Sequence, residues 1–371
     1  QTDVPIIELK NPEIWGNSKK AVQRTDNPDN VAYTIYTSGT TGKPKGVRVK
    51  NRGVANMVNY LKRTYEVDYS DCILQFANYV FDAFVWELAV SLLAGAELVL
   101  IDMNTIHDIE RFNTYVKNKG ISITLLPPQY YLQTNIEGLK VLTTGGSASN
   151  PEVVRKATNN RKYINAYGPT ENTVLATHWI YEQETAIPNS IPIGKPMDNV
   201  KAYVIQGDRL CGLEMPGELC IAGDGLAEGY LNKKELTDKA FSTNPYGEGR
   251  LYHTGDLVRW LPDGNLEYLG RIDEQVKIRG FRIEKCEVEN AFRNATGVKD
   301  VVILDLVDKS GEKNLFAYLI SDKKLDVHDI RLVAMKQLPG YMMPAYILQI
   351  DKIPLTKSGK PDKVTLEEYY R

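Results

Sequence analysis

The chain has 371 residues, with 45 basic and 47 acidic side chains and a formal net charge of -2. This length suffices for two or three domains, and the near balance of charge gives no indication of a nucleic-acid or anionic-membrane surface. No run approaches the roughly 18 apolar residues of a membrane span. Four cysteines lie far apart without a CxxC spacing, which argues against a zinc ribbon or a disulfide framework. We therefore expect a soluble, cytoplasmic protein.

The first half of the chain alternates predicted strands and helices. The run "AELVLI" is short enough for a buried strand, and Ile109, Phe112 and Val116 then recur at helical spacing before Gly120 ends the helix. The strand "ISITLLPP" follows. A second unit consists of "LKVLTTGG", a polar helix near 150–159 and "KYINAYGPTE". These βαβ units predict an α/β fold with ligands at the strand ends.

Two further regions differ from the first half in their sequence patterns. Beyond Ile193, the runs "KAYVIQ", "GELCIAG", "LYHTGDLVRWL" and "GNLEYLGRI" are separated by Gly, Pro and Asp, which predicts a meander or small barrel. From about Asp273, a helix in "KCEVENAFRNATG" and the strands "VVILDLV" and "NLFAYLI" precede a helix that Asp326 opens and that closes near Pro339. This region predicts a compact α+β domain of about 100 residues.

The stretch "YTIYTSGTTGKPKGV", Tyr33 to Val47, combines hydroxyl residues, glycines and lysines behind an apolar run. Small donors beside mobile cations suit a polyanion such as a nucleotide triphosphate. It is not a Walker loop, because Gly39 and Gly42 are only three apart and Pro44 follows Lys43. A phosphate loop of another design and an ordinary polar turn both remain open.

Three other loops carry weak signals when each is taken alone. "NAYGPTEN" puts an aromatic ring, a hydroxyl and a carboxylate at a strand end, a set suited to a base and a magnesium ion. "YHTGDLVRW" places Asp256 after Gly255, where a carboxylate could bind a ribose diol or simply stabilise a turn. "PLTKSGKPDK" presents Lys360 on a glycine turn, although a terminal lysine is usually just solvated.

Together these stretches, with "FDAFVWE", "GELCIAG" and "GRIDEQVKIRGFRIE", occur in the order and approximate spacing of the adenylation domains of nonribosomal peptide synthetases. The chain resembles that family over essentially its whole length. The first and last motifs are shared with the wider adenylate-forming superfamily, which includes acyl-CoA synthetases and luciferases. "FDAFVWE" and "NAYGPTE" indicate the amino-acid-activating branch.

The resemblance implies the adenylate-forming enzyme fold, with α/β layers and a small β-barrel-like subdomain, followed by a mobile α+β C-terminal domain. Residues 1–272 would form a partial N-terminal core with the ATP and amino-acid sites. Residues 273–371 would form the mobile domain that carries the catalytic lysine. The family rotates this domain about the position that matches Asp273, for which an ordinary interdomain turn is the alternative.

The resemblance also implies the reaction and its participants. An amino acid and ATP give aminoacyl-AMP and pyrophosphate with Mg²⁺, and a phosphopantetheine thiol of a peptidyl carrier protein then takes the aminoacyl group. The carrier protein and a condensation domain, in cis or in trans, would be the partners in nonribosomal peptide and antibiotic biosynthesis. Neither a nucleic acid nor a membrane is expected.

Motif by motif, the resemblance assigns the ATP site. The residues expected to wrap the β- and γ-phosphates are Thr37, Ser38, Gly39, Thr40, Thr41, Gly42, Lys43 and Lys45. The remaining expected ATP-binding residues are Gly146, Asn165, Tyr167, Gly168, Asp256, Tyr268 and Arg271, with Tyr167 on adenine and Asp256 on the ribose hydroxyls. Thr170 is expected at the α-phosphate and Glu171 at the metal. Lys360 would bridge the substrate carboxylate and the α-phosphate.

Asp82 is the most informative residue for the substrate. The family places an aspartate there to pair with the ammonium group, whereas an aryl or fatty acid gives no reason to bury an unpaired carboxylate. The aligned pocket wall consists of Ala83, Trp86, Leu125, Thr143, Gly145, Ala166, Val174 and Leu175. This uncharged wall resembles pockets for Phe, Tyr or Trp, although Trp86 could instead shorten it toward Leu or Val.

The chain departs from the family in two places. Only about thirty residues precede the phosphate loop, which predicts a fragment or a trimmed piece, and Ser358 stands where the last motif usually has Asn. Two other functions stay open. An acyl-CoA or aryl-acid ligase should not need Asp82, and a catalytically incompetent docking module would be expected to lose Lys360, Glu171 or Asp256.

Overall fold

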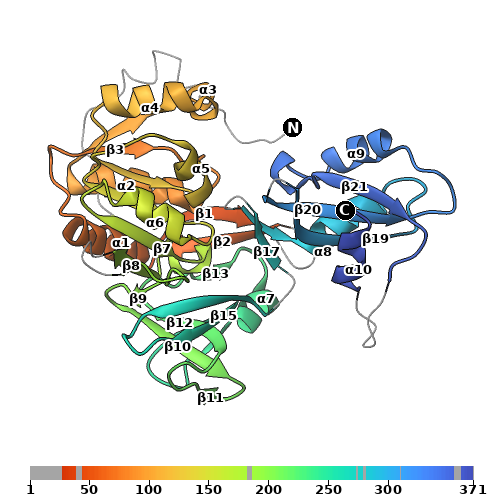
Figure 1. The fold of residues 1–371 in the computed structure, drawn as a ribbon. Helices are drawn as coiled ribbons and strands as arrows, with labels where there is room; N and C mark the ends of the chain where they lie inside the picture. The colour runs from red at the N-terminus through yellow and green to blue at the C-terminus, as the bar shows by residue number, and fades with distance from the viewer. Residues whose placement is uncertain are drawn as a thin grey trace, which may run out of the picture.

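The computed structural model describes residues 27–38, 44–181, 186–272, 275–278, 281–309, 311–354 and 361–370. In Figure 1 the described residues up to 272 form a larger lobe, and the described residues from 275 onward form a smaller one. Within the described part of the chain, no helix combines the length and the apolar character needed to cross a bilayer.

A seven-stranded sheet in the order β4-β3-β5-β6-β7-β8-β9 extends from the upper part of the larger lobe down its left-hand side in Figure 1. The first five strands in this order run parallel to one another, and β8 runs antiparallel to both of its neighbours, β7 and β9. The predicted βαβ units are therefore confirmed. The strands are β3 (Cys72–Gln75), β4 (Glu97–Leu100), β5 (Ile123–Leu126), β6 (Val141–Thr144), β7 (Tyr163–Tyr167), β8 (Thr177–Tyr181) and β9 (Lys195–Pro196).

Strand β4, which contains most of "AELVLI", is not the buried strand that its apolar letters predict. It lies at the edge of the sheet and pairs only with β3 among the described strands, so that Val99 is buried while Leu100 is 65% exposed. An edge strand has one neighbour only, and its apolar side chains lose part of their cover.

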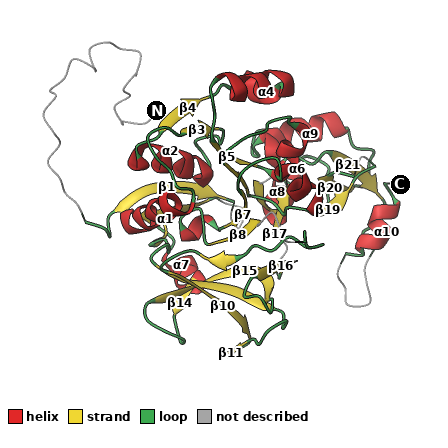
Figure 2. Ribbon diagram, turned by 60° about the vertical axis from the view of Figure 1, so that its left-hand side comes forward, coloured by secondary structure: helices red, strands yellow, loops and turns green. Residues whose placement is uncertain are grey.

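Helices follow the strands and pack on the sheet, as Figure 2 shows from a second direction. In α4, Phe112 and Val116 face the core and Gly120 ends the helix with φ +61°, which confirms the predicted helix and its stop. The helical segments of this lobe are α1 (Asn51–Thr64), α2 (Asp82–Ala94), α3 (Met103–His107), α4 (Ile109–Asn118), α5 (Pro128–Gln133), α6 (Pro151–Ala157), the 3-10 turn η2 (Thr170–Asn172) and α7 (Lys234–Ala240).

Two antiparallel sheets complete the larger lobe. One has the order β1-β2-β13, and the other has the order β11-β10-β12-β15-β14 with β16 paired to β15. The second sheet confirms the antiparallel region expected beyond Ile193, but among the described strands it runs between two free ends and does not close into a barrel. The strands are β1 (Val31–Thr37), β2 (Lys45–Lys50), β10 (Val200–Gln206), β11 (Arg209–Leu210), β12 (Gly217–Gly223), β13 (Gly229–Tyr230), β14 (Phe241–Thr243), β15 (Arg250–Trp260) and β16 (Leu266–Arg271).

The smaller lobe is α+β, as its sequence predicts. A three-stranded sheet in the order β19-β20-β21 carries helices, and the carboxylate of Asp326 accepts the N–H groups of His328 and Asp329 at the start of α9. The elements are the hairpin β17 (Gln275–Ile278) and β18 (Phe281–Glu284), then α8 (Lys285–Arg293), β19 (Asp300–Val307), β20 (Lys313–Ile320), α9 (Val327–Met335), the 3-10 turn η3 (Gly340–Met342), β21 (Tyr346–Ile350) and α10 (Lys363–Glu368).

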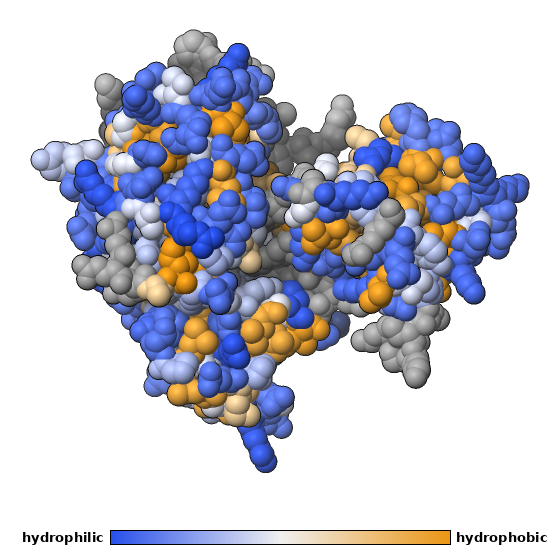
Figure 3. All heavy atoms as spheres, viewed as in Figure 1, coloured by the Kyte–Doolittle hydropathy of each residue, from blue (hydrophilic) through white to orange (hydrophobic). Residues whose placement is uncertain are grey.

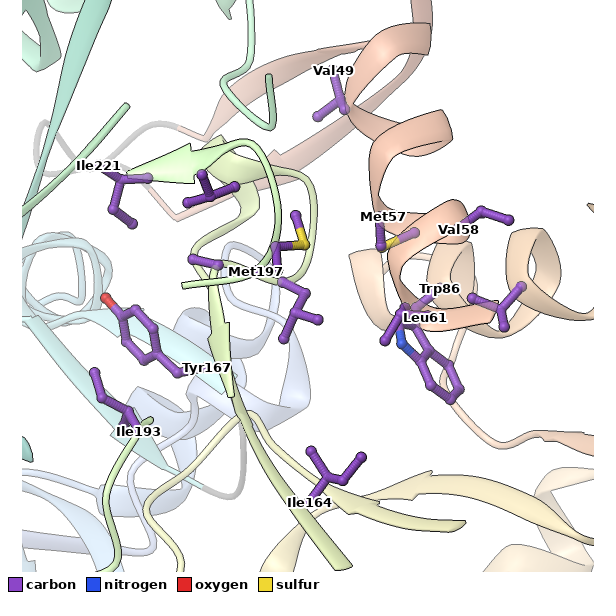
Figure 4. Close-up of a cluster of buried hydrophobic side chains, with 14 of the residues drawn as sticks. Val49, Met57, Val58, Leu61, Trp86, Ile164, Tyr167, Ile193, Met197 and Ile221 are labelled. Atoms are coloured by element: carbon purple, nitrogen blue, oxygen red, sulfur yellow. The ribbon is translucent and has the colours of Figure 1, made fainter. Parts of the chain in front are cut away.

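The main hydrophobic core joins the sheets of the larger lobe. Figure 4 shows Met57 and Leu61 of α1 next to Trp86 of α2, with Ile164 on strand β7. Burial of this apolar surface fixes α2 against the sheet. The surface in Figure 3 is mostly hydrophilic, with separate hydrophobic patches over both lobes.

Candidate active site

An apolar cavity of about 290 Å³ opens where the parallel strands of the seven-stranded sheet end. Parallel sheets place ligands at this edge because the loops after the strands converge there. The segments after β3, β5, β6 and β7 all contribute to the wall. Eight residues that the sequence predicts for the amino-acid pocket line it: Asp82, Ala83, Trp86, Leu125, Gly145, Ala166, Val174 and Leu175.

Asp82 is the first residue of α2 and the only charged residue among the described residues that line this cavity. The N-terminus of a helix carries partial positive charge, which favours a carboxylate there. The Oδ2 atom of Asp82 accepts a hydrogen bond of 2.6 Å from the hydroxyl of Thr170 in η2. Apart from Asp82 and the amide of Asn78, the side chains of this wall are therefore apolar or small.

Thr143, the ninth predicted pocket residue, is completely buried and does not line the cavity. Its Oγ1 lies 2.7 Å from the hydroxyl of Tyr65, the residue that ends α1. The ring of Tyr65 also packs against Trp86, with centroids 5.8 Å apart. The threonine hydroxyl thus has a partner inside the protein, and Trp86 supplies the wall.

Glu87, the last residue of "FDAFVWE", accepts hydrogen bonds from the backbone of two residues that line the cavity. The sequence predicted no role for it. Its Oε1 atom accepts the N–H groups of Phe76 and Ala77, each at 3.1 Å, and both of these residues line the cavity. Its side chain is completely buried, and this burial raises the pKa of Glu87 to about 8. In the sequence, the sign of this role is an acidic residue among the apolar residues that form α2.

The backbone turn after η2 is strained, and it positions part of the wall of the amino-acid cavity. Thr173 and Val174 have φ values of +50° and +68°, a region that β-branched residues rarely adopt. Thr173 donates a hydrogen bond of 2.6 Å to the carbonyl of Gly225, which helps to hold this turn. A Cβ atom on Gly168 would lie 2.1 Å from the carbonyl oxygen of Val174. Only glycine fits this close approach, which brings Val174 to the cavity.

A second cavity of about 260 Å³ adjoins the first and shares Gly146, Ala166 and Gly168 with it. Its wall is more polar, since Ser147, Ser149 and Asn189 contribute hydroxyl and amide groups. Five residues that the sequence predicts for the nucleotide line it: Gly146, Asn165, Tyr167, Gly168 and Tyr268. The structure therefore brings the predicted adenine contacts together beside the predicted amino-acid pocket.

Asp256 links this second cavity to β16. The hydroxyl of Tyr167 donates to Oδ2 of Asp256, and Arg271 donates from Nη1 to Oδ1 at 2.9 Å. Burial and then the charge of Asp256 raise the pKa of Tyr167 well above its usual value. Three predicted nucleotide residues thus form one connected, buried group.

Glu171 and Lys45 form a buried ion pair at the other side of η2. Lys45 Nζ lies 3.2 Å from Oε1 of Glu171, and Tyr230 donates a hydrogen bond of 2.8 Å to the same oxygen. The lysine also lies 3.0 Å from the Tyr230 hydroxyl. Mg²⁺ in nucleotide sites uses one or two carboxylates together with phosphate oxygens, so the Glu171 carboxylate fits this ion chemically. Tyr230 had not been predicted.

Other predicted residues lie at or beyond the limits of the described chain. Thr37 ends β1, and Ser38 follows it and is buried. Gly39, Thr40, Thr41, Gly42 and Lys43 lie outside the described residues, as do Asp273 and Lys360. Their predicted roles remain predictions.

An aromatic group from the smaller lobe reaches the amino-acid cavity. Phe281 of β18 lines it, and its ring lies 5.0 Å from Phe81, which precedes α2, and is stacked at 4.3 Å on Tyr341 of η3. The sequence places Phe281 in "GRIDEQVKIRGFRIE" but gives no sign of this contact.

Comparison with known families settles what kind of chain carries these two cavities. A family model described as AMP-binding enzyme matches residues 3–231. The chain belongs to the AMP-binding enzyme family. Among curated members, gramicidin S synthase 1 of Brevibacillus brevis is 43% identical over 91% of this chain. Tyrocidine synthase 1 of Brevibacillus parabrevis is 39% identical over 98% of it.

This AMP-binding chain spans about a third of these two relatives, 31% and 34% of their lengths. Among solved structures, holo-PA1221, described as an NRPS protein containing adenylation and PCP domains, is 26% identical. It covers 99% of this chain with a TM-score of 0.84, and this chain covers 64% of it. The adenylation domain AlmE of Vibrio cholerae shares the fold, with a TM-score of 0.82. It is 24% identical, and the match covers 93% of this chain and 67% of AlmE.

Proposed function

We propose that this chain activates an amino acid with ATP to give aminoacyl-AMP and pyrophosphate. It then transfers the aminoacyl group to the phosphopantetheine thiol of a peptidyl carrier protein. The observation that carries the proposal is the pair of adjoining cavities, one apolar with Asp82 on its wall and one polar with Tyr167 on its wall. An amino acid needs a carboxylate for its ammonium group and apolar space for its side chain.

The proposed substrate is a large hydrophobic or aromatic amino acid. Asp82 is the only charge on the described wall, and apart from Asn78 the rest of that wall is apolar or small. Trp86 forms one side of the cavity, while Gly145 and Ala166 leave space at the ends of β6 and β7. A second charged group on the amino acid would lose its hydration there without gaining a partner.

The first half-reaction needs no protein nucleophile. The carboxylate of the amino acid attacks the α-phosphorus of ATP, and the bond to the pyrophosphate oxygen breaks. Positioning and charge neutralisation lower the barrier of such a step. Asp82 holds the ammonium group, Thr170 beside it is placed to contact the α-phosphate, and Lys360 neutralises the charge that develops between the two reactants.

The same proposal assigns the nucleotide contacts. Tyr167 stacks on adenine, and Asp256, oriented by Arg271, receives the ribose hydroxyls. Mg²⁺ held at Glu171 supplies charge neutralisation for the phosphates. Lys45 is already at that carboxylate and moves toward the phosphates when ATP binds.

The relatives support the second half-reaction. PA1221 is described as holding adenylation and PCP domains in one protein, and NpsA-ThdA as an artificially fused adenylation-PCP di-domain. The named synthases of gramicidin S and tyrocidine support a role in nonribosomal peptide synthesis. A carrier protein and a condensation domain are accordingly the proposed partners, in the same chain or in another, and the proposed location is the cytoplasm.

The decisive experiment measures amino-acid-dependent exchange of pyrophosphate into ATP across the twenty common amino acids. We expect the highest exchange with Phe, Tyr or Trp. A panel of aryl and fatty acids is the control, because exchange driven by acids without an amino group would instead support an acyl-CoA or aryl-acid ligase. Nucleotide binding without exchange for any acid would support a docking module.

A further inference from the structure

A glutamate, a cysteine and a histidine meet on the six-stranded antiparallel sheet, outside both cavities. Glu218 and Cys220 lie two positions apart on β12, and Cys220 pairs with His253 of β15. One ligand atom from each of the three residues lies within 4.8 Å of the other two. Across the described residues, this is the only trio of such side chains that meets this distance.

The alternation of side chains along the strands puts these groups on the sheet face away from the main core. Leu219 and Ile221, which alternate with Cys220 on β12, are completely buried in that core. Cys220 belongs to a small cluster on the opposite face and is completely buried as well. The side chains of Glu218 and His253 are 25% and 36% exposed, so a small ion can reach these two groups from solvent, while the Cys220 thiol is buried beside them.

A β-bulge fixes the carboxylate of this group. Glu218 pairs with Leu257, and Cys220 pairs with His253. The one residue of β12 between Glu218 and Cys220 is therefore opposite the three residues of β15 between His253 and Leu257. Gly255, in the bulge, has φ +70° and donates its N–H to Oε1 of Glu218 at 2.9 Å. The other carboxylate oxygen is thereby directed toward His253.

Two of the separations lie within about 0.2 Å of those around a tetrahedral zinc ion. His253 Nδ1 lies 3.1 Å from Oε2 of Glu218 and 3.4 Å from Sγ of Cys220. With zinc bonds of about 2.0–2.3 Å, the edges of a tetrahedron are about 3.3–3.6 Å. The Oγ atom of Ser242 on β14 lies 3.0 Å from Nε2 of His253 and forms a hydrogen bond with it. When Nδ1 binds a metal ion, the Ser242 hydroxyl can accept the proton on Nε2 and so orient the ring.

We propose that Glu218, Cys220 and His253 bind a zinc ion through Oε2, Sγ and Nδ1, with a water molecule as the fourth ligand. The site joins β12 to β15 directly beside the bulge that leads to Asp256. Its role is structural, because it ties together two strands at the point where the ladder is irregular. The wide spacing of the cysteines in the sequence excludes a zinc ribbon but has no bearing on a site built across two strands.

Binding releases protons. Zinc bonds to the thiolate and to the neutral imidazole, so the thiol proton leaves, together with the second imidazole proton when the ring is charged. The affinity for zinc is therefore expected to fall as the pH is lowered.

The test is a titration of the full chain with Co²⁺ in the absence of ATP and Mg²⁺. Co²⁺ occupies zinc sites, and a bound thiolate gives an intense near-ultraviolet charge-transfer band. We expect such a band to saturate at one Co²⁺ per chain and to disappear when one equivalent of Zn²⁺ is added. A wild-type protein without this band overturns the proposal.

Variants then locate the site. Cys220→Ser and His253→Gln are expected to lose the band, whereas Cys72→Ser and Cys211→Ser, which change cysteines elsewhere, keep it. Ser242→Ala is expected to weaken binding about tenfold by removing the partner of the imidazole. Circular dichroism checks that each variant folds, and should one ligand variant fail to fold, the other supplies the same test. A band that persists in a folded Cys220→Ser or His253→Gln protein overturns the assignment.

Discussion

The hydroxyl of Thr170 donates a hydrogen bond of 2.6 Å to the carboxylate of Asp82. This contact joins the start of α2 to the η2 turn, two segments 88 positions apart in the chain. Asp82 is the proposed partner of the substrate ammonium group, and Thr170 is the proposed contact of the α-phosphate. A ligand held by both would place its carboxylate beside the phosphate that it attacks.

The first prediction is that Asp82→Ala abolishes amino-acid activation and spares ATP binding. Loss of one partner of a desolvated ion pair costs about 3–5 kcal/mol, or a hundredfold to a few thousandfold in exchange rate. Pyrophosphate exchange and nucleotide binding measure the two effects. Asp326→Ala, which removes only the cap of α9, is the matched control and should retain exchange. Exchange by Asp82→Ala within a few-fold of wild type would show that another group binds the ammonium.

The second prediction concerns the choice between Phe and Tyr. Thr143 is the one residue of the predicted lining that could pair a phenol, and its hydroxyl is engaged by Tyr65 away from the cavity. An apolar pocket rejects an added hydroxyl by only about a hundredfold. We therefore expect Phe to be preferred over Tyr by no more than this factor in pyrophosphate exchange. A preference for Asp, Lys or Gly would contradict the proposed pocket.

Trp86 offers a separate test of pocket depth. Its buried ring lines the cavity, so Trp86→Ala should enlarge the space and move the preference toward bulkier side chains. The readout is the ratio of exchange rates for Trp and Leu in the variant and in the wild type. An unchanged ratio would mean that Trp86 belongs only to the core.

The fourth prediction is a pH dependence of stability that arises from Glu87. Its carboxyl has a pKa of about 8 in the folded chain, against an ordinary value of 4.5. Between these two values the folded chain retains a proton that the unfolded chain has released, so this contribution to stability falls as the pH rises from about 4.5 to about 8. Urea unfolding from pH 5 to pH 9 should show this fall in the wild type and a flatter profile in Glu87→Gln. Parallel profiles would contradict it.

The sequence predicted the parts of the fold that local patterns determine. The spacing of Phe112 and Val116 and the Gly120 stop identified α4, and Asp326 identified the start of α9. It failed for β4, because five of the six letters of "AELVLI" are apolar whether or not a second strand pairs with them. Position in a sheet depends on pairing, which no local window contains.

The candidate site shows the same division. Motif order placed eight of the predicted residues at one cavity, but it could not show that Thr143 is engaged by Tyr65. That contact joins residues 78 positions apart. The roles of Glu87 as a backbone acceptor and of Tyr230 at Glu171 likewise depend on the packing of distant segments.

The last prediction concerns movement between the two half-reactions. Adenylate formation needs Lys360 at the α-phosphate, while thioester formation needs an open path for the pantetheine arm to the same carbon. One static arrangement cannot serve both, and a few residues near Asp273 could absorb the change in backbone dihedral angles. In the present structure Phe281 of the smaller lobe contacts Phe81 at the amino-acid cavity, so residues that follow this segment already reach the site.

We therefore expect Asp273→Pro to spare adenylation and slow loading of the carrier thiol, and Lys360→Ala to do the reverse. Phe281→Ala should follow the pattern of Asp273→Pro, because it removes a contact that the smaller lobe makes in this arrangement. Pyrophosphate exchange measures the first half-reaction, and carrier acylation from preformed adenylate measures the second. Lys336→Ala, an exposed residue at the end of α9, is the control and should change neither. Equal losses in both assays for Asp273→Pro and Lys360→Ala would rule out the hinge.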